Sequence, residues 1–104
     1  MRCKIDVPDH AILIAISYCR AFAAWDGKLR LNAAQAEIVQ TVEDAARKVM
    51  WGEERLLRDM IRCVGYRVSY HNAPHSLIMS YSEGTYKRRK HDIVTEIVNL
   101  LGIA

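Results

Sequence analysis

The sequence lacks any apolar run long enough to cross a bilayer. Its longest apolar run covers residues 11–16, whereas a membrane-spanning helix needs about 20 apolar residues in succession. Behind the charges of the N-terminal segment there is no apolar region of the kind that a secretory signal peptide requires. We therefore expect a protein without a membrane partner.

Proline and glycine are also scarce, and the cysteines are few. The three cysteines, Cys3, Cys19 and Cys63, are odd in number and far apart, which argues against a disulfide framework and for reduced thiols in the cytoplasm. No repeat, low-complexity stretch or Pro/Gly/Ser-rich linker interrupts the 104 residues. Since 51% of them are apolar and 26% are charged, the sequence predicts one compact domain over residues 1–104, with a core that needs no metal or disulfide.

Positive charge is gathered in one stretch of the chain. The 15 Lys and Arg residues exceed the 12 Asp and Glu residues by three, and removal of Lys87, Arg88, Arg89 and Lys90 leaves 11 basic residues against 12 acidic ones. The sequence therefore predicts one basic patch on a nearly neutral body. Such a patch can steer a nucleic acid or an acidic protein surface toward one face of a molecule.

Three helices are predicted in the first two thirds of the chain. The first has Asp6 as its N-cap and ends at Asp26, and apolar residues on most of its sides indicate a central helix. The second begins after Asn32, where Gln35 three positions on completes a capping box. The third starts at residues 53–54 and has Gly65 as its expected C-terminal cap.

After the third helix the pattern of the sequence changes. The segments "YRVSYH" and "SLIMSYS" are rich in β-forming residues and flank "NAPH", a turn-forming cluster, so they predict an antiparallel β-hairpin. A last helix follows, with a buried stripe that begins at Ile93 and with Gly102 at its end. The expected fold class is α+β: three helices, a β-hairpin and a C-terminal helix. An all-α bundle is the alternative.

The basic cluster falls at the expected start of this last helix. Cations in a first turn oppose the helix dipole, at a cost of a few tenths of a kcal/mol each, and the free N–H groups there can bind a phosphate or carboxylate. Folding gives no reason for these charges, so we interpret the cluster and the tyrosines near it as a partner-binding face. The predicted face consists of Tyr70, Tyr81, Tyr86, Lys87, Arg88, Arg89, Lys90 and His91.

Residues able to carry catalysis or hold a metal are present, but no motif joins them. His71 and His75 have the spacing of two metal ligands on one helix face, but Pro74 lies between them and no CxxC pair or carboxylate cluster completes the set. Cys19 and Cys63 fall at core or edge positions of helices, and there is no nucleophile elbow, phosphate-binding glycine loop or dinucleotide fingerprint. We therefore expect no enzyme, no metal and no cofactor.

Two limited resemblances bear on function. The segment "AAWDGKLRLNAAQAEI" resembles part of TerB-like tellurite-resistance helical domains and half of an EF-hand, but Lys28 and Arg30 stand where calcium requires acidic residues, so no function is transferred. The expected order of helices and hairpin also matches that of winged-helix DNA-binding domains, with Arg55, Arg58 and Arg62 on the polar side of the third helix.

Two functions agree with these features. The favoured one is a non-enzymatic protein-interaction or inhibitor module that binds a larger protein or nucleoprotein complex. A phage- or mobile-element-encoded inhibitor of a host nuclease or defence complex would be an example. The alternative is a winged-helix-like module that contacts DNA or RNA phosphates through residues 87–90. A homodimer, through the hairpin edge or the apolar end "LLGIA", agrees with both.

Overall fold

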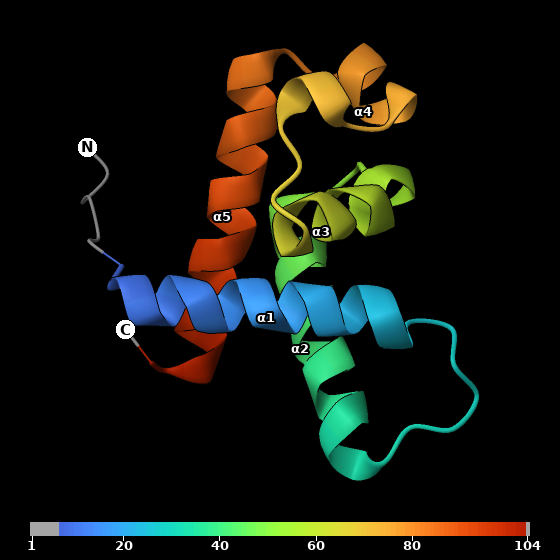
Figure 1. Ribbon diagram of the computed structural model, residues 1–104, viewed down its shortest axis with the longest axis vertical. Coiled ribbons are helices and arrows are strands. Elements are labelled where there is room, and N and C mark those ends of the chain that lie inside the picture. Colours follow the sequence, from blue (N-terminus) through green and yellow to red (C-terminus); the bar gives the residue numbers. More distant parts are fainter. Residues whose placement is uncertain (1–6, 104) are drawn as a thin grey trace.

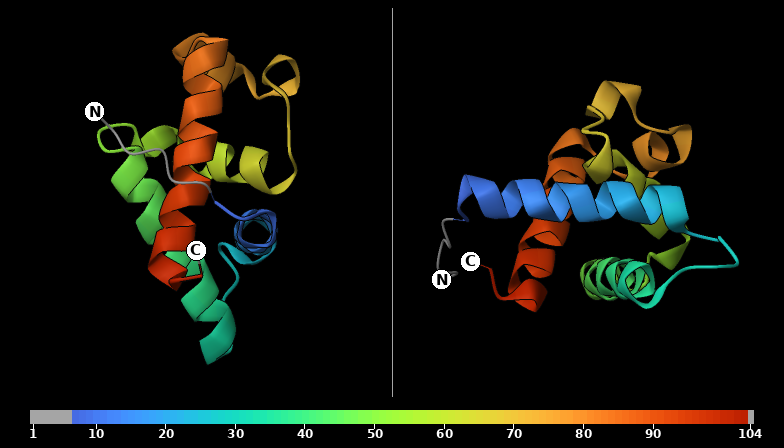
Figure 2. Two further views of the ribbon diagram at one scale, coloured as in Figure 1. Left: turned by 90° about the vertical axis from the view of Figure 1, so that its left-hand side faces the viewer. Right: turned by 60° about the horizontal axis from the view of Figure 1, so that its bottom comes forward.

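The computed structural model describes residues 7–103, which form helices and connecting loops (Figure 1). In chain order they are α1 (Asp9–Trp25), α2 (Ala33–Val49), the 3-10 turn η1 (Glu54–Leu56), α3 (Leu57–Gly65), the 3-10 turn η2 (Tyr70–Asn72), α4 (His75–Ser80) and α5 (Glu83–Leu101). α1 lies across α2 and α5, and Figure 2 shows both of these helices on the same side of it. Within the described range, no helix is both long and apolar enough to cross a lipid bilayer.

The core is built around α1. The buried face of this helix carries the small side chains of Ala11, Ala15 and Cys19, none of which has exposed surface, and it continues to Phe22. Small side chains let neighbouring helices approach closely, and α1 contacts α2, α3 and α5. The other large side chains that are fully buried are Val42, Met50, Leu57, Met60, Ile61, Leu77, Tyr86, Ile93, Ile97 and Val98.

α1 and α3 are in close backbone contact at Gly65. A Cβ atom on Gly65 would lie 2.7 Å from the backbone nitrogen of Arg20 and 2.9 Å from its Cα, distances that real Cβ atoms do not show. The Arg20 side chain reinforces the contact, because its Nε donates to the Gly65 carbonyl oxygen at 3.1 Å. The prediction that Gly65 caps α3 is therefore wrong; this glycine is the last helical residue and serves the packing of two helices.

Arg67, not a glycine, closes the C-terminal end of α3. Its φ is 54°, in the left-handed region. The N–H of Val68 donates to the Cys63 carbonyl at 3.0 Å and that of Arg67 to the Val64 carbonyl at 3.3 Å, the two bonds of a Schellman motif. A residue with a side chain adopts this conformation at a cost of about 1–2 kcal/mol, which glycine avoids. Folding alone therefore does not favour arginine here.

Several predicted helix ends are confirmed. α1 ends before Asp26, and Gly102, with a φ of 66°, closes α5. The capping box of α2 is present: the Asn32 side chain accepts the N–H of Gln35 at 2.8 Å, and the Gln35 side chain accepts the N–H of Asn32 at 3.0 Å. The predicted N-cap Asp6 lies outside the described residues.

The predicted β-hairpin is wrong, and with it the α+β fold class. Residues 66–82 contain η2, α4 and loops, and none of residues 7–103 lies in a strand. The left-handed Arg67 turns the chain out of an extended path, and Pro74 directly precedes α4. Leu77 and Tyr81, four positions apart, are both buried, as one face of a helical turn would place them. The all-α alternative agrees with the structure.

The start of α5 also differs from the prediction. Ser82 is its N-cap, with the Oγ accepting the N–H of Thr85 at 3.2 Å, and the carboxylate of Glu83 lies in the first turn, where the dipole favours it. Residues 87–90 are therefore the fifth to eighth residues of α5 and lie beyond its first turn, where the dipole acts weakly and no N–H groups are free. The predicted conflict between these cations and the dipole is wrong.

Replacement of Gly65 by alanine should loosen the contact between α1 and α3. We expect Gly65→Ala to lower the free energy of unfolding by about 1–3 kcal/mol, because the new methyl group must displace the backbone of Arg20. Gly84→Ala is the matched control: it is also helical, and its Cβ would meet nothing within 4 Å, so we expect a gain of about 0.5–1 kcal/mol. Urea denaturation measures both, and equal effects would contradict the packing argument.

Candidate functional site: the basic segment of α5

The four consecutive cations of α5 do not lie on one face. Successive residues of a helix point about 100° apart, so four in a row extend over most of its circumference. Lys87 and Arg88 are exposed, whereas Arg89 and Lys90 are partly buried. Two of the four predicted partner-binding cations therefore contact the protein itself.

Arg89 is held by the carboxylate of Glu53, the residue that precedes η1. Its Nε donates to Glu53 Oε1 at 3.3 Å, and its guanidinium carbon lies 5.8 Å from the centre of the Tyr81 ring. The Tyr81 hydroxyl donates to the same Glu53 oxygen at 2.7 Å. Burial, followed by the Glu53 hydrogen bond, raises the pKa of Tyr81 to about 12, so its hydroxyl keeps its proton. This network ties the N-terminal half of α5 to the segment before α3.

Lys90, the next residue of α5, is held by the segment that follows α3. Its Nζ donates to the carbonyl oxygen of Val68 at 2.8 Å and lies 4.9 Å from the centre of the Tyr86 ring. The Tyr86 hydroxyl donates to the same carbonyl at 2.6 Å. Burial lowers the pKa of Lys90, since the charged ammonium has lost part of its water.

The predicted tyrosines belong to the interior. Tyr86 is 1% and Tyr81 7% exposed, and Tyr70 is partly buried. The Tyr70 ring meets the Tyr86 ring edge-on at 5.5 Å, and its hydroxyl lies 2.6 Å from the Tyr81 carbonyl oxygen. Their rings hold α5, η2 and α4 together and position Arg89 and Lys90, but they offer little surface to a partner.

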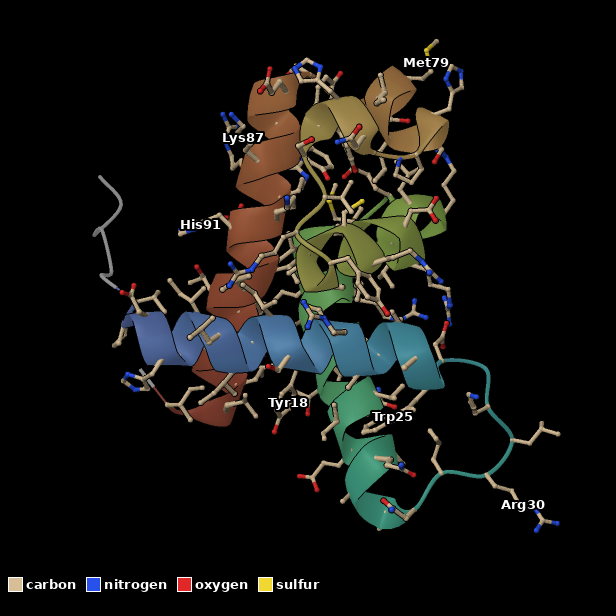
Figure 3. The ribbon with its side chains drawn as sticks, viewed as in Figure 1. Tyr18, Trp25, Arg30, Met79, Lys87 and His91 are labelled. Carbon is tan, nitrogen blue, oxygen red and sulfur yellow. The ribbon has the colours of Figure 1, made fainter. Side chains whose placement is uncertain are left out.

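Three of the predicted residues share an exposed face. Lys87, Arg88 and His91 are exposed, and spacings of three and four positions make them neighbours on the helix. Figure 3 shows Lys87 and His91 on the same side of α5. Lys87 forms an ion pair with Glu83 one turn earlier at 3.1 Å, a surface contact of little energy. We call Lys87, Arg88 and His91 the α5 cationic face.

Two of the cysteines and two of the histidines considered as reactive or metal-binding residues lie in the described part of the chain. Burial raises the pKa of the Cys19 thiol to about 12 and also raises that of Cys63, so both stay protonated at neutral pH. His71 lies in η2 and His75 begins α4, and both are exposed. In the part of the chain that the structure describes, no three His, Cys, Asp or Glu residues lie close enough together to hold a metal ion. Cys3 lies outside that part.

Comparison with known proteins adds nothing to this geometry: the chain matches no protein family model, and no curated protein or solved structure is significantly similar to it. Function is therefore inferred from the arrangement of its residues.

The shared acceptor on Val68 gives one test of this arrangement. Tyr86→Phe should cost about 1 kcal/mol, because Lys90 still donates to the Val68 carbonyl. Combined with Lys90→Met, it should cost more than the sum of the two single changes, since the carbonyl then has no donor left. A double-mutant cycle by urea denaturation measures this coupling. Tyr66→Phe is the control at an exposed tyrosine, and simple additivity would refute the shared role.

The Glu53 network should make stability depend on pH. The hydrogen bond from Tyr81 in the first place, and then Arg89, lower the pKa of Glu53 from its usual 4.5. A carboxylate whose pKa folding lowers stabilises the protein above its unfolded pKa, and that contribution is lost as the pH falls through the folded pKa. The wild type should therefore be more stable than Glu53→Gln at neutral pH, and the difference should shrink below pH 4.5. Urea titrations across this range measure it; a constant difference would contradict it.

Proposed function

We propose that the protein is a non-enzymatic interaction module that binds an acidic surface of a larger protein through the α5 cationic face. It would act in the cytoplasm by occupying or recruiting that surface, for example on a nuclease or defence complex. The proposal depends on one observation, that the basic side chains of α5 divide into two groups. Arg89 and Lys90 bond to other parts of the protein, whereas Lys87, Arg88 and His91 are exposed to solvent.

The charges of this face favour a protein partner over a nucleic acid. Nucleic-acid binding depends on the number of phosphates that cations neutralise, and two of the four residues in the basic run, Arg89 and Lys90, already bond to the protein itself. The winged-helix version also required a hairpin as its wing, and residues 66–82 form none. A small cationic face of this kind suits one acidic patch on a protein.

The proposal is tested by charge reversal on α5. Lys87→Glu with Arg88→Glu should weaken the complex with the partner by at least about tenfold, because attraction becomes repulsion at the interface. The matched control is Lys28→Glu with Arg30→Glu, which changes the net charge equally at exposed positions of the loop after α1; Figure 3 shows Arg30 far from Lys87. The partner is recovered by affinity purification from cells that carry the gene, and its affinity is then measured for all three proteins.

Retention by the loop variant and loss by the α5 variant is the expected result. Equal loss by both variants would mean that net charge alone drives binding, and retention by both would remove the α5 cationic face from the interface. Labelled duplex DNA and RNA are measured in parallel. Binding with a steep salt dependence that only the α5 variant loses would replace the protein partner by a nucleic acid.

A further inference from the structure

An apolar groove opens beside the α5 cationic face. Its volume is about 250 Å³, and its floor is formed by Ile12 and Ile16 of α1, Val64 of α3 and Val94 of α5. Ile12 and Ile16 are only partly buried although both are large aliphatic residues. The groove therefore leaves apolar surface in contact with water, and covering it would be favourable.

The edge of this groove is basic. Arg67, Lys90 and His91 line it, from the turn after α3 and from α5. Lys90 donates one hydrogen bond to Val68, which leaves two of its three ammonium hydrogens for a ligand. Since burial lowers the pKa of Lys90, a carboxylate placed beside it would restore part of the stabilisation that its charge has lost. His91 also belongs to the α5 cationic face, so the groove and that face are continuous.

Arg67 is the second observation that points to a ligand. Its left-handed conformation has a cost that a glycine at the same place would avoid, and the side chain kept there lines the groove. Residues held in unfavourable backbone conformations gather at binding sites, where the side chain is needed for something other than folding.

The size of the groove selects its occupant. Sites for small molecules enclose about 300–1,000 Å³, and this open groove is smaller. It suits one or two side chains, as a pocket for an anchor residue at a protein interface does. We infer that the groove takes an aliphatic anchor side chain from an acidic segment of the partner, with the flanking carboxylates of that segment paired with Arg67, Lys90 and His91. This inference rests on the proposed function, because it assumes a protein partner.

Two synthetic peptides test the groove directly. Both are fluorescein-labelled, rich in glutamate and of equal charge; one carries two leucines a helical turn apart, and the other carries glutamines in their place. Fluorescence anisotropy should show that the wild type binds the leucine peptide about tenfold more tightly, because only that peptide buries apolar surface. Ile16→Gln should remove this preference. Met79→Gln, which changes an exposed apolar residue outside the groove, should keep it.

Arg67 allows stability and binding to be separated. Arg67→Gly should raise the thermal midpoint by roughly 4–8 °C, the shift expected from relief of about 1 kcal/mol, because glycine accepts the left-handed conformation, and should weaken binding of the leucine peptide several-fold. If Arg67 served only the structure, its replacement would not raise the thermal midpoint and weaken peptide binding at the same time. Arg67→Lys keeps both the charge and the strained backbone, so it should retain most of the binding.

The outcomes distinguish the groove from the proposed function. Equal affinity for the two peptides, or binding of neither, would overturn the groove inference. If both peptides bound equally but lost affinity for the variant with Lys87→Glu and Arg88→Glu, the α5 cationic face would stand without the groove. Unchanged binding by Arg67→Gly would remove Arg67 from the site and overturn its assigned role.

Discussion

The close approach of α1 and α3 at Gly65 is the constraint on which the other contacts depend. With no side chain at Gly65, the backbone of Arg20 lies directly against it, and α3 fits onto the small-residue face of α1. This contact holds the C-terminal end of α3 against α1, and the turn at Arg67 then leads to Val68. The carbonyl of Val68 then accepts hydrogen bonds from Tyr86 and Lys90, which join α5 to the pair formed by α1 and α3. The close contact at Gly65 and the hydrogen bonds to Val68 together connect α1, α3 and α5.

Patterns in the sequence predicted the structure correctly only where the stabilising contacts join residues that are close together in the chain. Asn32 and Gln35 form a capping box whose partners lie three positions apart, so the sequence shows both of them. The β-rich residues after α3 gave the wrong element, because β propensity depends on neighbours that a single segment does not reveal. There Tyr70 bonds to carbonyls of α4 and of the turn after it, and no partner strand is present within residues 66–82.

The candidate site was predictable in part for the same reason. The sequence located the charge on α5, and helix geometry separates Lys87 and Arg88 from the two cations that follow once the start of α5 is known. The sequence did not indicate Glu53 as the partner of Arg89, because the two residues lie 36 positions apart. Glu53 accepts hydrogen bonds from both Arg89 and the Tyr81 hydroxyl. Nor did the sequence indicate Arg67, because the predicted hairpin placed that residue in a strand. The sequence argument for a functional role of the basic run was that its cations oppose the dipole of α5. That unfavourable interaction does not exist, because the run lies beyond the first turn of the helix.

The stronger departure from a folding rule is a single residue at the end of α3. Among residues 7–103, the backbone has positive φ at Gly27, Gly52, Gly102 and Arg67, so three of these four positions hold the residue that suits the conformation best. Because α3 ends in the same kind of turn as α5, and α5 uses Gly102 there, a glycine would have served at Arg67 as well. Sequences break local rules mainly where a side chain has another task. Because the guanidinium of Arg67 lines the apolar groove, the groove is where we expect this side chain to act. The basic run alone did not indicate that position.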